Sequence, residues 1–122
     1  MDYRDKSKKQ LTTILGFEAC GTCLLVVIVN ILGVSSKHAQ PGEETGPYAF
    51  NYVMALFAIT FICWDVAPSQ FNSAIALGQA LFNYRDDFKD NMKSLVLTVI
   101  AQFIGTTAGF FLTYMCIYRE NF

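Results

Sequence analysis

Charged residues are scarce in this sequence, and neither sign is in excess. Only 16% of the 122 residues are charged, and nine lysines and arginines oppose ten aspartates and glutamates, which gives a net charge of -1. Such a chain has no basic surface for a phosphate backbone, so nucleic-acid binding is excluded. The sequence also lacks a nucleophile–base pair, a phosphate-binding loop and a cluster of metal ligands. We therefore predict that the protein is not an enzyme, with no catalytic residue, metal or cofactor.

Apolar residues dominate the composition. They make up 53% of the chain, aromatic residues make up 15%, and the mean hydropathy is +0.35. Since a helix needs about 20 apolar residues to cross the ~30 Å hydrocarbon core of a bilayer, the runs at about 11–34, 47–66 and 94–118 are each long enough to span. These spans nearly fill the chain. We predict an all-α membrane protein with a polar tail at 1–10 and a single transmembrane domain at 11–122.

A fourth apolar segment, at about 72–83, is too short to cross a membrane. It follows Pro68, which breaks a helix, and it begins at Asn72, whose side chain can cap a helix by accepting from a backbone N–H group. A segment of about three turns beside full spans is typical of a re-entrant half-helix or of a helix at the interface. The predicted fold is therefore three transmembrane helices plus a re-entrant half-helix.

The positive charges predict an orientation. Two of them, Lys37 and Arg119, fall on one side of the predicted spans. Seven fall on the other side: Arg4, Lys6, Lys8, Lys9, Arg85, Lys89 and Lys93. Because positive charges are retained on the cytoplasmic side, the N-terminus is expected on the cytoplasmic or matrix side.

Three motifs occur in an order that resembles the N-terminal half of the aquaporin (major intrinsic protein) family. They are EACGT at 18–22, QFNSAIAL at 70–77 and AQFIG at 101–105. The family has a Glu followed by Gly-Thr in its first helix, a re-entrant loop with an Asn-Pro-Ala signature, and Ala-Gln-x-x-Gly in its third helix. The resemblance implies half of an aquaporin-like fold. Ser73 replaces the signature proline, and Gln70 and Ala76 replace the usual His and Thr.

The resemblance also implies roles for individual residues. Glu18, together with Gln102, is expected to brace the backbone of the re-entrant loop; a proton or ion relay at Glu18 is the alternative. Asn72, Ser73 and Ala74 would line a pore in a full channel, and the alternative is that Asn72 only caps its own helix. The family's second repeat, with its filter arginine, has no counterpart here after position 105.

Small residues indicate where helices pack closely. Gly105 and Gly109 form a stripe that lets another helix approach, and that helix could come from this chain or from another one. Gly21, between Cys20 and Cys23 in a predicted span, is interpreted as one of a group of small buried residues rather than as part of a redox or metal motif.

Three functions remain open. The first is a non-transporting aquaporin-like accessory subunit of a larger membrane complex, whose partners are other membrane subunits and lipids. For its host we expect a respiratory-chain complex of the mitochondrial inner membrane. The alternative is a half-pore that assembles with a second aquaporin-like chain to conduct water or a small neutral solute. A transiently bound assembly factor would have a similar sequence.

Overall fold

A computed structural model describes residues 3–36, 45–66, 70–82 and 88–119, which form four α-helices and no strand. These are α1 (Tyr3–Ser36), α2 (Thr45–Cys63), α3 (Ser73–Phe82) and α4 (Phe88–Arg119). The all-helical class predicted from the sequence is confirmed for these residues. Lys37 and Arg85, two of the positive charges used to predict the orientation, lie outside them.

The helix ends differ from the predicted spans. α1 begins at Tyr3 rather than at 11, and α4 begins at Phe88 rather than at 94. Neither added segment contains Pro or Gly, so both helices continue beyond their apolar part into polar sequence. α2 ends at Cys63, where the Val66 N–H donates to the Cys63 carbonyl (3.0 Å) in a closing turn.

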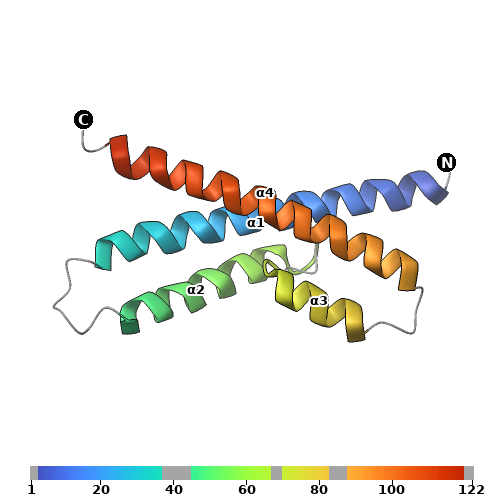
Figure 1. Cartoon of the computed structure of the whole chain (residues 1–122), viewed down its shortest axis with the longest axis horizontal. Coiled ribbons are helices and arrows are strands. Elements are labelled where there is room, and N and C mark those ends of the chain that lie inside the picture. Colours follow the sequence, from blue (N-terminus) through green and yellow to red (C-terminus); the bar gives the residue numbers. More distant parts are fainter. Residues whose placement is uncertain (1–2, 37–44, 67–69, 83–87, 120–122) are drawn as a thin grey trace.

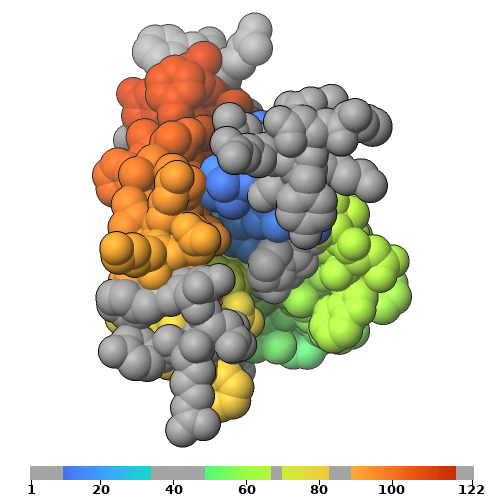
Figure 2. All heavy atoms as spheres, turned by 90° about the vertical axis from the view of Figure 1, so that its right-hand side faces the viewer, coloured from blue at the N-terminus to red at the C-terminus, as the bar shows by residue number. Residues whose placement is uncertain are grey.

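The helices form a crossed bundle (Figure 1). α1 and α4 run in the same direction and cross, whereas α2 runs in the opposite direction. α3 starts beside the end of α2 and runs toward the end of the bundle at which α1 and α4 begin. Viewed from that end, α1 lies between α4 and α2 (Figure 2), in keeping with its contacts with both. α3 packs on α4.

The apolar core lies between α1 and α2. Its buried members are Leu25, Val29, Ala55, Ile59, Cys63 and Phe71. Five polar residues are buried elsewhere in the bundle: Glu18, Thr22, Thr98, Gln102 and Thr113. Glu18 has an exposed fraction of 0% and is the largest fully buried side chain. The interior therefore combines a small apolar core with an unusually polar centre around Glu18.

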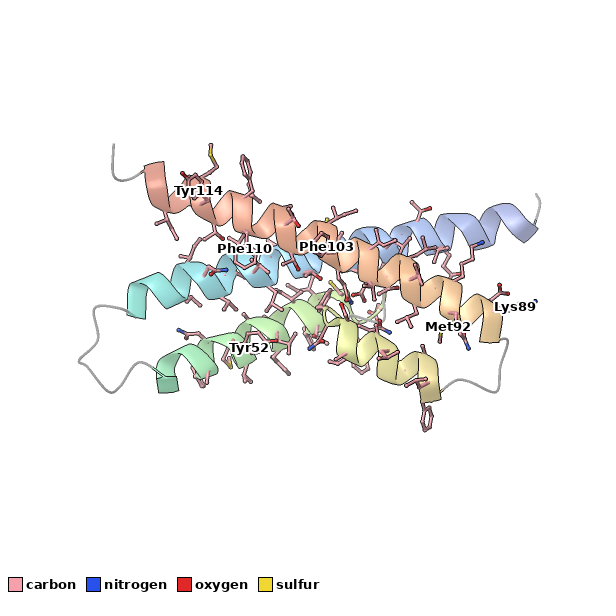
Figure 3. All side chains as sticks on the ribbon, in the orientation of Figure 1. Tyr52, Lys89, Met92, Phe103, Phe110 and Tyr114 are labelled. Atoms are coloured by element: carbon pink, nitrogen blue, oxygen red, sulfur yellow. The ribbon has the colours of Figure 1, made fainter. Side chains whose placement is uncertain are left out.

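Two of these helices are long and apolar enough to cross a membrane: Gln10–Gly33 within α1 and Lys89–Ile117 within α4. The apolar part of α2, Ala49–Cys63, is shorter, and so is α3. Large apolar side chains cover the outside of the bundle. On α4 they include Phe103, Phe110 and Tyr114, spread from the middle of the helix toward its C-terminal end (Figure 3).

Candidate functional site

Glu18 connects α1 to the segment that leads into α3. One of its carboxyl oxygens, Oε1, accepts a hydrogen bond from the Gln70 N–H at 2.9 Å, and the other, Oε2, accepts from the Phe71 N–H at 3.0 Å. A buried backbone N–H that finds no acceptor costs about 1–3 kcal/mol. Glu18 therefore satisfies two donors that precede α3 and have no helical partner of their own.

Gln102 of α4 completes this arrangement. Its Nε2 donates to Glu18 Oε2 at 3.0 Å, and its Oε1 accepts from the Ser73 hydroxyl at 2.9 Å. This orientation of the Gln102 amide is chemically consistent. The Glu18 carboxyl oxygen accepts from the NH2 group, and the Ser73 hydroxyl donates to the amide oxygen. We call the five linked residues the Glu18 network: Glu18, Gln70, Phe71, Ser73 and Gln102. The network joins α1, α4 and the start of α3.

Phe71 holds the only described non-glycine backbone with a positive φ, at 43°. The left-handed conformation costs a residue with a Cβ roughly 1–2 kcal/mol. The hydrogen bond from its N–H to Glu18 offsets this cost, as does its side chain, which is buried against Gly21. A Cβ on Gly21 would overlap the Phe71 ring, so Gly21 is where α1 makes room for this turn.

Asn72 caps α3. Its Oδ1 accepts from the Ala74 N–H at 2.9 Å, and its carbonyl oxygen accepts from the Ala76 N–H at 3.0 Å. The side-chain contact is the usual way in which Asn satisfies a free N–H at a helix start. Asn72, Ser73 and Ala74 are all exposed. The structure brings Ser73 to Gln102, which in turn binds Glu18, and leaves Asn72 at the surface of the bundle.

The small residues of α4 pack on α1. Gly105 lies against the carbonyl oxygen of Ala19, and a Cβ on Gly109 would lie 2.8 Å from the carbonyl oxygen of Cys23. The neighbouring helix that the sequence left open is thus α1 of the same chain. The backbone of α1 occupies the space beside Gly105 and Gly109, because small residues let two helices approach closely.

The cysteines form no site in the described residues. All four are free, and no group of three His, Cys, Asp or Glu side chains is close enough there to hold a metal ion. Cys20 is exposed rather than buried, which differs from the expectation for small residues around Gly21. Its side chain lies on the outer side of α1, beside a shallow apolar groove that also includes Gly16.

A polar crevice that sequence reasoning missed lies between α3 and α4. Its volume is about 120 Å³, and its polar lining residues are Gln70, Gln79, Asn91, Ser94 and Thr98. A signal for it was present. Polar residues recur at 91, 94, 98 and 102, which is the three-to-four spacing of a single helix face. That face runs from the start of α4 to Gln102 and the Glu18 network.

Comparisons of the chain with family models, with curated proteins and with solved structures give no match. The site therefore rests on its own geometry. What it does chemically is accept and donate hydrogen bonds within the chain, at the point where α1, α3 and α4 meet.

Proposed function

We propose that the protein is an integral membrane protein with three spans and a re-entrant half-helix, and that it serves as a non-transporting, aquaporin-like structural subunit of a larger membrane complex. The observation that carries the proposal is the Glu18 network, because it anchors the start of a short helix to the interior of the bundle. A buried Glu and Gln dedicated to this anchoring are what the resemblance to aquaporins implies for Glu18 and Gln102.

The exposed side chains support a membrane location. α2 presents Phe57, Phe61 and Ile62 to the outside, and the turn after it presents Trp64, which is 75% exposed. Soluble monomers rarely expose contiguous apolar patches larger than a few hundred Å². Exposing these apolar side chains to water is unfavourable, whereas exposing them to lipid is not. The backbone groups of the helices are paired internally, as lipid requires.

The helix lengths support three spans and a half-helix. α2 has 19 residues, which at about 1.5 Å per residue extend about 28 Å, close to the ~30 Å hydrocarbon core. α3 has 10 residues and extends about half of that distance. Its end lies with the starts of α1 and α4 (Figure 1), as expected for a helix that leaves the bilayer on the side it entered.

The use of the polar atoms supports a structural role over transport. Both carboxyl oxygens of Glu18 and both amide atoms of Gln102 bind groups of the same chain. The side chain of Asn72 caps α3. Ala76 alone is buried along α3, and the exposed polar start of this helix needs a protein neighbour if it lies within lipid. We therefore expect a membrane partner, another subunit or a second aquaporin-like chain, to cover α3.

The positive charges at one end of the bundle support an orientation in the membrane. Lys89 and Lys93 are exposed at the start of α4, at the end of the bundle where α1 begins (Figure 3). Positive charge at this end favours an N-terminus on the cytoplasmic or matrix side. A respiratory-chain complex of the mitochondrial inner membrane is the host we propose.

The test is the mass of the native assembly. The protein is extracted in mild detergent, separated on a native gel, and identified by mass spectrometry together with the proteins that migrate with it. We expect it to migrate with a large complex at fixed stoichiometry. A monodisperse protein that migrates alone and conducts water in vesicles would contradict the structural role.

A second function, a half-pore, is favoured by one observation: Asn72, Ser73 and Ala74 are exposed at the start of α3, where a second half could face them. In this case the osmotic swelling of proteoliposomes requires both chains and falls on Asn72→Asp. Gly78→Ala, an exposed position on the same helix with open space around it, is the matched control. Permeability no greater than that of empty vesicles excludes the half-pore.

A further inference from the structure

A threonine hydroxyl lies at the crevice between α3 and α4 and has no hydrogen-bond partner among the described residues. Thr98 is only 7% exposed, and it makes no hydrogen bond with any residue that the structure describes. Thr113, buried to the same degree on the same helix, donates to the carbonyl oxygen of Gly109 at 2.8 Å. Among the described residues no fully buried polar side-chain atom lacks a partner, so the Thr98 hydroxyl oxygen is open to the crevice, where a molecule from outside the chain can bind it.

The lining of the crevice selects the kind of partner. Its polar side chains are amides and hydroxyls, with no charged group among the residues that line it. This argues against an ion, which would lose its hydration without compensation. An acyl chain does not fit either, because the Gln70 and Gln79 side chains, which hydrogen-bond each other, lie across one wall. A small neutral molecule that both donates and accepts hydrogen bonds fits this surface.

We propose that the crevice holds a cluster of water molecules that connects the aqueous phase at the start of α4 with the Thr98 hydroxyl. The volume of about 120 Å³ is well above the ~10–15 Å³ that one water needs, so the crevice accommodates several waters. Ser94, one turn closer to the start of α4 than Thr98, is exposed and lies on the path. The proposal rests on the membrane location given above, because only there does water in the crevice differ from bulk solvent.

The hydrated crevice has a consequence for α3. Only Ala76 of this helix is buried, so apolar packing holds it weakly against α4. Waters that bridge the amides of one helix and the hydroxyls of the other supply a second contact at little cost in free energy. Gln70 lines the crevice with these waters, and its backbone N–H donates to Glu18 in the interior of the bundle. Water thus reaches the outer side of the Glu18 network.

Cysteine labelling tests the proposal in sealed vesicles that contain the full chain. Thr98→Cys, Ser94→Cys and Ile100→Cys are each treated with a charged, membrane-impermeant thiosulfonate from the side of the α4 start, and modification is located by mass spectrometry. Ile100 is 50% exposed on the outside of α4, where lipid excludes both the thiolate and the reagent. We expect Thr98→Cys to react at least about tenfold faster than Ile100→Cys, although Thr98 is the more buried in the protein.

The three variants separate the possible failures. Thr98→Cys changes the side-chain volume little, and an unchanged native mass shows that the variant assembles. Reaction at Ser94→Cys without reaction at Thr98→Cys means that the inner crevice is dry and overturns the proposal. Reaction at Ile100→Cys as fast as at Thr98→Cys contradicts the membrane location itself, and with it the proposed function.

Discussion

At the scale of single residues, Glu18 carries the most consequential contacts in the chain. It is fully buried, and three donors from two other parts of the molecule end on its two oxygens. Glu18→Ala leaves the Gln70 N–H, the Phe71 N–H and the Gln102 amide without acceptors, at about 1–3 kcal/mol each. We expect a loss of stability of at least about 3 kcal/mol, measured by thermal unfolding in detergent.

Hydrogen exchange gives the same prediction a local readout. The amides of Gln70 and Phe71 should exchange much faster in Glu18→Ala, because they lose the groups that protect them. Thr22→Val is the control: it removes a hydroxyl that donates to the Glu18 carbonyl oxygen at 2.7 Å within α1, and should cost about 1 kcal/mol. Equal effects of the two variants would show that the carboxyl group does not anchor the start of α3.

Ser73 offers a second test at this scale. It is the first residue of α3, a position that suits the fixed φ of proline, and its hydroxyl donates to Gln102. Ser73→Ala and Ser73→Pro both lose that bond, but proline also restricts the unfolded chain. We expect Ser73→Pro to exceed Ser73→Ala in stability by about 0.4–1 kcal/mol, measured as the difference in thermal unfolding. A proline variant less stable than the alanine variant would argue against the aquaporin-like geometry of this turn.

At the scale of helices, the packing of α4 on α1 depends on glycine. A Cβ at Gly105 would overlap the backbone of Ala19, which cannot move away as a side-chain tip could. We expect Gly105→Ala to lower the stability of the bundle by about 1–3 kcal/mol or more through overpacking, measured by thermal unfolding in detergent. Gly16→Ala on α1 is the matched control, because nothing lies within 4 Å of the added Cβ. Equal losses in both variants would show that the effect is one of helix propensity and not of packing.

The helices themselves were largely predictable from the sequence, whereas their partners were not. The long apolar runs at 11–34 and 94–118 fall within α1 and α4. Their extension into polar sequence was missed, because hydropathy marks the part of a helix that suits lipid and not where its backbone bonding ends. Local sequence also could not reveal that Gly105 faces Ala19, since that contact depends on how two distant helices cross.

The site, too, was predictable from the sequence only in part. An acidic residue within an apolar helix must find donors, and the resemblance implied that Glu18 finds them in the re-entrant loop. The donors that it meets are backbone groups 52 and 53 positions away, which only the resemblance indicated, since no side-chain pattern identifies a backbone N–H. Thr98 was missed because a lone threonine in an apolar helix usually bonds its own backbone, as Thr107 and Thr113 do.

At the scale of the whole molecule, the number of membrane crossings decides how the bundle sits in a bilayer. α1 and α4 are long and apolar enough to cross, while α2 falls short by the same measure. If α2 crosses, the connection between α1 and α2 lies on the side opposite to the start of α4. If α2 does not cross, the two lie on the same side, which would require α1 and α4 to run in opposite directions rather than in the same direction as in Figure 1. The two arrangements therefore differ in the relative sidedness of Lys37 and Lys93.

We expect three crossings, and hence opposite sides for Lys37 and Lys93. A membrane-impermeant amine reagent added to sealed vesicles of one orientation should modify Lys93 together with Lys8, and should leave Lys37 unmodified until the vesicles are opened. The physical reason is that α2 as a whole is close in length to the hydrocarbon core and exposes Phe57, Phe61 and Ile62, which burial in lipid removes from water. Modification of Lys37 together with Lys93, with Lys8 protected, would mean that α2 and α3 lie on one face of the membrane. That result would contradict the parallel arrangement of α1 and α4, and with it the Glu18 network that joins them.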